Sequence, residues 1–230
     1  MRYTTLLFDA DDTLMDFRTA EQLALTDVLR QHNLPTDDDF LSVYHTINNG
    51  LWEQYNLGQI PKSEITSTRF VRLFEHFSIA LDGVSFNERY LDCLAEHGDL
   101  LPGAKALCET LWRAGHSMYI ITNGIGRVQK SRFERSGLSP YFKDIFISET
   151  IGVGKPNKEF FDHVLSSIAN ADRSDALVIG DSLSADIAGG CAAGLDTCWC
   201  DFRKVCQPHG ATYRVESFAE LQALLIGGLS

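Results

Sequence analysis

Polar residues gather in four short motifs of this 230-residue chain, and three of the motifs directly follow a short apolar run. Open α/β sheets bind their ligands beyond the carboxyl ends of the strands, so residues that close an apolar run are the first candidates for a site. We therefore treat the four motifs as one set. They are Asp9-Ala10-Asp11-Asp12-Thr13, Thr122-Asn123-Gly124, Gly154-Lys155-Pro156 and Gly180-Asp181-Ser182-Leu183-Ser184-Ala185-Asp186.

The residue types in these motifs are those that phosphoryl transfer requires. The reaction needs a nucleophile, positive charge against the transferring group and a proton for the leaving oxygen. Carboxylates are also the hard oxygen ligands that Mg²⁺ prefers. Alone, an Asp-x-Asp-x-Thr motif is more often a solvated acidic turn, and a lysine such as Lys155 is more often a surface residue. Together, the four motifs favour phosphate chemistry at a metal site.

The apolar runs have the length and branching of buried parallel strands. Helical segments lie between most of them. Residues 101–114, for example, open with Pro102, carry apolar residues at Leu107 and Leu111, and end before Gly115. This alternation predicts an α/β fold, with a Rossmann-like three-layer core built on a mostly parallel sheet. The predicted strands are 4–8, 118–122, 145–148, 177–180 and 197–200.

An insertion separates the first two predicted strands by far more chain than one crossover needs. Apolar residues recur in it at helical spacing. We expect an inserted α-helical cap domain at 16–98 that sets substrate specificity, and an α/β catalytic core formed by 1–15 and 99–230. The predicted helices of the cap are 19–32, 38–55, 62–77 and 85–97.

The composition is that of a folded protein, with 44% apolar and 22% charged residues. A formal net charge of −11 argues against a nucleic acid polymer or an anionic membrane as a partner, although a bound cation would still let an acidic site hold phosphate. No signal peptide or transmembrane run is evident, and the six cysteines are scattered. We therefore expect a cytoplasmic protein, whose protein partners the sequence does not identify.

The order and spacing of the motifs resemble those of the haloacid dehalogenase-like hydrolase superfamily over nearly the whole chain. The pattern of that superfamily is Asp-x-Asp after the first strand, Thr or Ser after the second, a Lys, and then Gly-Asp with a further Asp. The resemblance implies that Asp9 is a nucleophile that forms an aspartyl-phosphate. It also implies that Asp11 protonates the leaving oxygen and then activates water. Asp12 receives no role, and we expect it in a turn.

The same resemblance implies a Mg²⁺ cofactor. Its protein ligands would be Asp9, the backbone carbonyl of Asp11, and Asp181. Asp186 would meet the metal through water or orient its neighbours.

The resemblance further implies a phosphate-binding set. The Thr122 hydroxyl and nearby backbone N–H groups, that of Asn123 included, would bind the phosphoryl oxygens. The Lys155 ammonium would oppose the negative charge of these oxygens and of Asp9, so the resemblance implies that Lys155 is also a catalytic residue.

Within the superfamily the chain resembles the bacterial pyrimidine 5′-nucleotidases, in its length and in the segments Phe-Asp-Ala-Asp-Asp-Thr-Leu, Ile-Thr-Asn-Gly and Gly-Asp-Ser-Leu. This similarity implies a small-molecule phosphomonoester substrate, a nucleoside monophosphate such as UMP, dUMP or dTMP. Asp11 argues against a dehalogenase, because those enzymes lack the acid two residues after the nucleophile. Two alternatives stay open: a broad sugar-phosphate phosphatase or phosphomutase, and a non-catalytic regulator that binds metal or phosphate.

The sequence also contains two patterns that suggest other binding sites, and neither pattern fits those sites. Gly124-Ile125-Gly126 starts like a dinucleotide-binding fingerprint, but Gln129 stands where the third glycine belongs. A cluster of cysteines and a histidine has ligand types suitable for zinc, but its spacing fits buried strand residues better. Its members are Cys198, Cys200, Cys206 and His209.

Overall fold

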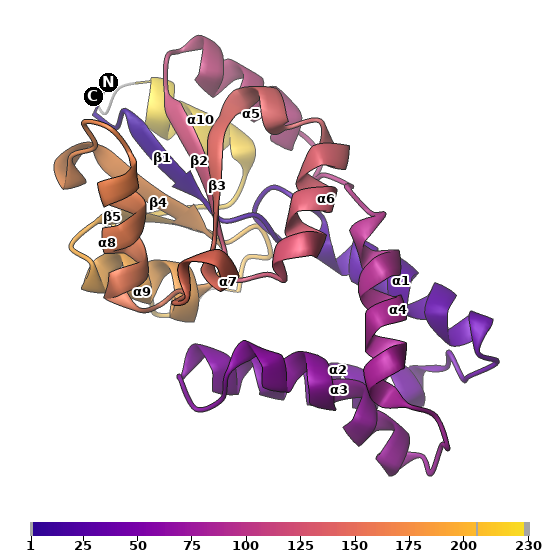
Figure 1. The fold of residues 1–230 in the computed structure, drawn as a ribbon. Coiled ribbons are helices and arrows are strands. Elements are labelled where there is room, and N and C mark those ends of the chain that lie inside the picture. Colours follow the sequence, from indigo (N-terminus) through magenta and orange to yellow (C-terminus); the bar gives the residue numbers. More distant parts are fainter. Residues whose placement is uncertain (1, 206, 228–230) are drawn as a thin grey trace. The chain divides into compact units, whose positions relative to one another are not determined.

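A parallel six-stranded sheet forms the centre of the α/β part of the molecule (Figure 1). The computed structural model describes residues 2–205 and 207–227. The strands are β1 (Thr5–Phe8), β2 (Ser117–Thr122), β3 (Phe142–Ile147), β4 (Ala176–Gly180), β5 (Asp196–Cys200) and β6 (Tyr213–Val215). Their order in the sheet is β3-β2-β1-β4-β5-β6. Because β1 pairs in parallel with both β2 and β4, the carboxyl ends of these three strands lie side by side.

Helices and short helical turns connect the strands of the sheet, and the last helix follows the last strand. They are α5 (Ala104–Arg113), α6 (Gly126–Ser136), η1 (Ser139–Tyr141), α7 (Ser148–Ile151), α8 (Lys158–Ser167), η2 (Arg173–Asp175), the short π-helix η3 (Leu183–Ile187), α9 (Ala188–Ala192) and α10 (Phe218–Ile226). Successive residues of a strand face opposite sides of a sheet. Leu6 and Phe8 therefore pack in one apolar cluster with residues of α5, α6 and α10, whereas Leu7 packs in a second cluster with residues of α8. This arrangement confirms the predicted three-layer α/β core.

A second compact unit, Arg18–His97, interrupts the first, which consists of Met1–Phe17 and Gly98–Ser230. The carboxylates of Asp37 and Asp82 accept hydrogen bonds from backbone N–H groups in the first turns of two of its helices. Aromatic rings pack against one another in its interior. The unit is a helical insertion, which is the kind of structure that the sequence predicts. Its helices are α1 (Phe17–Gln31), α2 (Asp38–Asn56), α3 (Lys62–His76) and α4 (Gly83–Ala95). Across 2–205 and 207–227, no helix combines the length and the apolar character needed to cross a bilayer.

The two edge strands differ from the sequence prediction. β3 begins at Phe142 instead of residue 145, because the exposed Lys143 and Asp144 interrupt the apolar pattern inside the strand. β6 was not predicted, since only Val215 of its three residues is buried. An edge strand with one neighbour and one covered face does not need an apolar run.

Candidate active site

Two aspartates that follow neighbouring strands meet at the carboxyl edge of the sheet. Asp9 directly follows β1 and Asp181 directly follows β4, its parallel neighbour. Asp186 reaches the same place from η3. One carboxylate oxygen of each residue lies within 4.8 Å of the other two. The sheet and one turn of π-helix therefore bring together three carboxylates that are far apart in the sequence.

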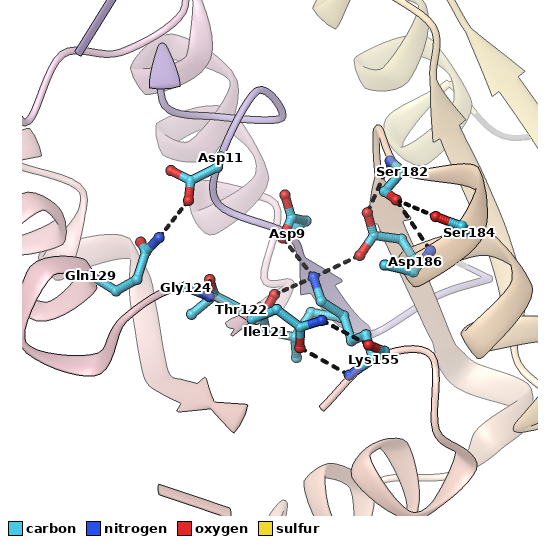
Figure 2. Close-up of polar contacts among 12 residues, drawn as sticks. Asp9, Asp11, Ile121, Thr122, Gly124, Gln129, Lys155, Ser182, Ser184 and Asp186 are labelled. Carbon is cyan, nitrogen blue, oxygen red and sulfur yellow. Dashed lines mark hydrogen bonds and ion pairs between the residues drawn. The ribbon is translucent and has the colours of Figure 1, made fainter. Parts of the chain in front are cut away.

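Lys155 lies between two of these carboxylates (Figure 2). Its Nζ donates to Asp9 Oδ1 at 2.6 Å, to Asp186 Oδ1 at 2.6 Å and to the Ile121 carbonyl at 2.9 Å. An ammonium group carries three hydrogens, so these acceptors use all of them. Since Lys155 is only 3% exposed, its charge is compensated by the protein and not by water.

The loop that carries Lys155 is fixed to the end of β2 by Asn123. The Asn123 side chain donates through Nδ2 to the Lys155 carbonyl at 2.7 Å and accepts the Lys155 N–H at Oδ1 at 2.9 Å. The side-chain amide of Asn123 thus positions Lys155. Its backbone N–H stays the group predicted to contact phosphate.

Both carboxylate oxygens of Asp186 accept hydrogen bonds from the protein. Oδ1 accepts from Lys155, and Oδ2 accepts from the Ser182 N–H at 3.1 Å. The close approach of Asp186 to the end of β4 requires a glycine there, because a Cβ added to Gly180 would lie 2.3 Å from Asp186 Oδ2. With both oxygens engaged, Asp186 is better suited to orienting Lys155 than to binding a metal directly.

Burial controls the ionisation of this cluster. It raises the pKa of Asp9 to about 7, although Lys155 opposes the shift. Burial, with the charges of Asp9 and Asp186, also raises the pKa of Asp181 well above its ordinary value. Burial lowers the pKa of Lys155, but the two carboxylates outweigh it and hold that pKa above its ordinary value. Three ionised carboxylates and one ammonium would leave two negative charges uncompensated.

A divalent cation is the counter-charge that this donor set fits. Mg²⁺ binds through one or two carboxylates and keeps several waters, and the mostly buried side chains of Asp9 and Asp181 are still 11% and 20% exposed. Arg203 donates to Asp181 Oδ2 at 3.3 Å, but its half-exposed guanidinium compensates the charge weakly. Asp9 and Asp181 are therefore the side chains that could hold the metal. The Asp11 carbonyl stays a predicted third ligand.

Thr122 ends β2 with a buried hydroxyl. Its Oγ1 accepts the Gly124 N–H at 3.0 Å. That bond uses an oxygen lone pair, so the hydroxyl hydrogen can still be donated to an acceptor such as a phosphoryl oxygen. The geometry is compatible with the predicted phosphate contact, which stays a prediction.

The Asp11 carboxylate points toward Gln129 on α6 and away from Lys155 (Figure 2). Gln129 Nε2 donates to Asp11 Oδ2 at 2.5 Å, and Arg132 Nη1 forms an ion pair with Asp11 Oδ1. The sequence analysis assigned no site role to either residue, because Gln and Arg on a helix usually face solvent. Their spacing of three residues was the one available signal, since it places them on the same helix face. Asp12 lies in a turn with a φ of 55°, as expected.

The residues that could have suggested zinc do not form a metal cluster in the described part of the chain. Cys198 and Cys200 are buried in β5, and the ring of His209 packs against Trp199 with centroids 5.1 Å apart. Cys206 lies outside the described residues.

Comparison with known proteins identifies the family. A model of the haloacid dehalogenase-like hydrolases matches residues 3–194. The chain belongs to this family. The pyrimidine 5′-nucleotidase PynA of Streptococcus pneumoniae is 40% identical over 226 residues, covering 96% of this chain and 94% of PynA. The pyrimidine 5′-nucleotidase YjjG of Escherichia coli is 37% identical, covering 98% and 99%. The predicted membership of a hydrolase family is confirmed.

A crystal structure agrees with this family assignment. That of YfnB from Bacillus subtilis, bound to magnesium, superposes on this chain with a TM-score of 0.92 at 41% identity. The match covers 98% of this chain and 99% of YfnB. Haloacid dehalogenase-like hydrolases generally use Mg²⁺, and the acidic cluster beside Lys155 has the donors for it.

Proposed function

We propose that the chain is a Mg²⁺-dependent phosphomonoesterase that forms an aspartyl-phosphate on Asp9 and acts on pyrimidine nucleoside 5′-monophosphates. One observation carries the chemistry: Lys155 joins Asp9 to Asp186 at 2.6 Å each, and Asp181 lies within 4.8 Å of both carboxylates. A nucleophile, a fixed positive charge and oxygen ligands for a metal are thus available together. Mg²⁺ held by Asp9 and Asp181 would supply further charge neutralisation.

In the first half-reaction a carboxylate oxygen of Asp9 attacks the phosphorus in line with the ester oxygen. The bond from phosphorus to the ester oxygen breaks, and the proton of Asp11 passes to that leaving oxygen. Lys155 and the Thr122 hydroxyl stabilise negative charge on the phosphoryl oxygens. The alcohol leaves, and the phosphoryl group stays on Asp9.

In the second half-reaction water attacks the phosphorus of the aspartyl-phosphate. Asp11, now ionised, takes a proton from this water while the bond from phosphorus to Asp9 breaks. Inorganic phosphate leaves, and both aspartates return to their starting states. A phosphomutase would instead have to exclude water and return the phosphoryl group to its substrate.

Support for nucleotides as substrates comes from the relatives PynA and YjjG, which are similar to this chain over almost its whole length. The core residues described above recognise a phosphoryl group and a metal, so they do not select a base. We assign that selection to the inserted unit Arg18–His97. In α2 of this unit, the half-buried rings of Trp52 and Tyr55 pack edge to face, with centroids 5.8 Å apart.

The test is release of inorganic phosphate from a panel of nucleoside monophosphates and sugar phosphates, each with Mg²⁺ and with EDTA. We expect Mg²⁺-dependent release with the highest kcat/KM for UMP, dUMP or dTMP. Release spread evenly over sugar phosphates would retain the mechanism and overturn the substrate. An isomerised product would indicate a mutase, and no release under any condition would overturn the enzyme proposal.

Asp9→Asn tests the nucleophile. The amide is a poor nucleophile, so kcat should fall by about 10⁴-fold or more while the fold is retained. Asp144→Asn is the matched control, because Asp144 is exposed on β3 and should leave kcat unchanged. Substantial turnover by a clean preparation of Asp9→Asn would refute the aspartyl-phosphate on this residue.

A further inference from the structure

We propose that Gln129 and Arg132 are positioning residues that hold the Asp11 carboxylate and stabilise the charge that develops on it during proton transfer to the leaving oxygen. The inference rests on the proposed phosphomonoesterase function. It concerns α6, an element that the catalytic motifs do not include.

Gln129 and Arg132 each bind one oxygen of the Asp11 carboxylate. Gln129 Nε2 donates to Oδ2 at 2.5 Å, and Arg132 Nη1 donates to Oδ1. Gln129 is 2% exposed and Arg132 is 0% exposed, whereas the Asp11 side chain is partly exposed. Two buried donors on one face of a helix therefore orient a carboxylate whose surroundings still admit solvent or substrate.

A buried guanidinium is costly unless it is paired, and replacing a buried ion pair by apolar residues is often neutral or stabilising. Packing alone therefore does not explain Arg132. Its guanidinium also lies over the ring of Phe17, with 5.4 Å from its central carbon to the ring centroid. The Arg132 guanidinium thus contacts both the Phe17 ring and the carboxylate of Asp11, the predicted acid.

Gln129 suits both protonation states of Asp11. Its NH₂ group donates to the Asp11 carboxylate in the structure, and this contact suits an ionised carboxylate. Within residues 2–205 and 207–227, its buried Oε1 has no hydrogen-bond partner, so a flipped amide would accept from the protonated acid. Arg132 can only donate, and it favours the ionised product of proton transfer. When the O–H bond of Asp11 breaks and the proton joins the leaving oxygen, the charge left on Asp11 meets both donors.

The end of β2 is shaped around this contact. A Cβ added to Gly124 would lie 2.1 Å from Gln129 Nε2 and 2.5 Å from its Cγ. Only a glycine leaves room for Gln129 in its observed position. The Thr122-Asn123-Gly124 motif therefore supports two catalytic residues. Asn123 positions Lys155, and Gly124 leaves room for Gln129, which holds Asp11.

The test compares two phosphomonoesters that differ in their need for a general acid. An alkyl ester such as UMP has a leaving oxygen that must be protonated, whereas p-nitrophenolate leaves without much help. We measure the rate of the first turnover by rapid quench, which separates phosphoryl transfer from the later attack of water, and KM from steady-state rates. The variants are Gln129→Met, Arg132→Met and Arg132→Lys, with Lys130→Met as the control on the exposed face of α6.

Gln129→Met should slow the first turnover of the alkyl ester by about 10- to 100-fold, with KM and the rate on p-nitrophenyl phosphate nearly unchanged. Arg132→Met should give the same pattern, and Arg132→Lys should recover part of the rate because it keeps the charge. Lys130→Met should match wild type. If Arg132→Met does not fold, the neutral Gln129→Met variant decides.

Equal losses on both esters, or no loss, would overturn this inference and leave the phosphomonoesterase proposal standing. A wild-type protein that hydrolyses neither ester would overturn both. The two failures are therefore distinguishable in one experiment.

Discussion

Replacing Lys155 with methionine is the sharpest test of how the site is held together. Methionine has nearly the length of lysine and fits a buried position, so the main change is the loss of one charge and three donors. In the structure these donors bind Asp9, Asp186 and the Ile121 carbonyl, and Lys155 is almost completely buried. The variant would leave three carboxylates near one another with no ammonium between them.

The expected loss of stability follows from this geometry. Removing one partner of a buried ion pair costs about 3–5 kcal/mol, because the other charge stays buried and unpaired. For a unit of this size, each kcal/mol lowers Tm by roughly 2–4 °C, so Lys155→Met should melt about 6–20 °C below wild type. Lys158→Met is a matched control. The ion pair of Lys158 with Asp162 joins side chains that are 52% and 38% exposed, and such a pair contributes about 0–1 kcal/mol.

The assay is a double-mutant cycle of urea unfolding at pH 7 in EDTA, with Lys155→Met, Asp186→Asn and the double variant. Because Asp186 is the more buried partner, the double variant should be more stable than the sum of the single losses predicts, by about 1–3 kcal/mol. The kcat of Lys155→Met should also fall by about 10²–10³-fold. A coupling free energy near zero, or a Lys155→Met protein as stable as Lys158→Met, would refute the electrostatic account of the site.

Three further predictions concern Asp11, the ionisation of Asp9 and the glycine at the end of β4. Asp11→Asn should lower kcat by about 10²–10⁴-fold, and a kcat near wild type would exclude Asp11 as the acid and base. It should also lower the free energy of unfolding, because it removes the negative charge beside the buried Arg132 guanidinium. In EDTA, the free energy of unfolding should fall by up to about 4 kcal/mol as the pH rises from about 4 to about 7. The reason is that the pKa of Asp9 is raised from 3.8 to about 7, so the folded protein keeps a proton that the unfolded chain has released. Mg²⁺ should flatten this dependence, and a flat profile in EDTA would contradict the raised pKa. Gly180→Ala should lower Tm and kcat together, since its Cβ would lie 2.3 Å from Asp186 Oδ2, and a crystal structure with Asp186 unmoved would contradict that explanation.

The sheet could be predicted where its strands are buried on both faces. All four residues of β1 and all five of β4 are buried, so each appears in the sequence as a short apolar run. The edge strand β6 could not be predicted, because Tyr213-Arg214-Val215 contains only one buried residue and a charged one. Its existence depends on pairing with β5, which is a tertiary contact.

The residues of the proposed site also include some that the sequence indicates and some that it does not. Asp9, Thr122 and Asp181 lie at or directly after strand ends, so the sheet topology and the motif pattern sufficed to nominate them. Gln129 and Arg132 lie in a helix whose sequence is strongly polar, and nothing in that sequence marks Arg132 as fully buried. A buried polar side chain is recognisable only when its partner is known, and here the partner is on a different element.

The contacts explain why the motifs contain residues whose side chains do no chemistry themselves. Gly124 leaves space for Gln129, and Gly180 leaves space for Asp186. Asn123 uses its whole side-chain amide on the backbone of Lys155. In each case a residue of one motif fixes a side chain that comes from another element, so the motifs depend on one another. Substituting either glycine should therefore resemble the loss of its distant partner, and not the loss of a nearby catalytic residue.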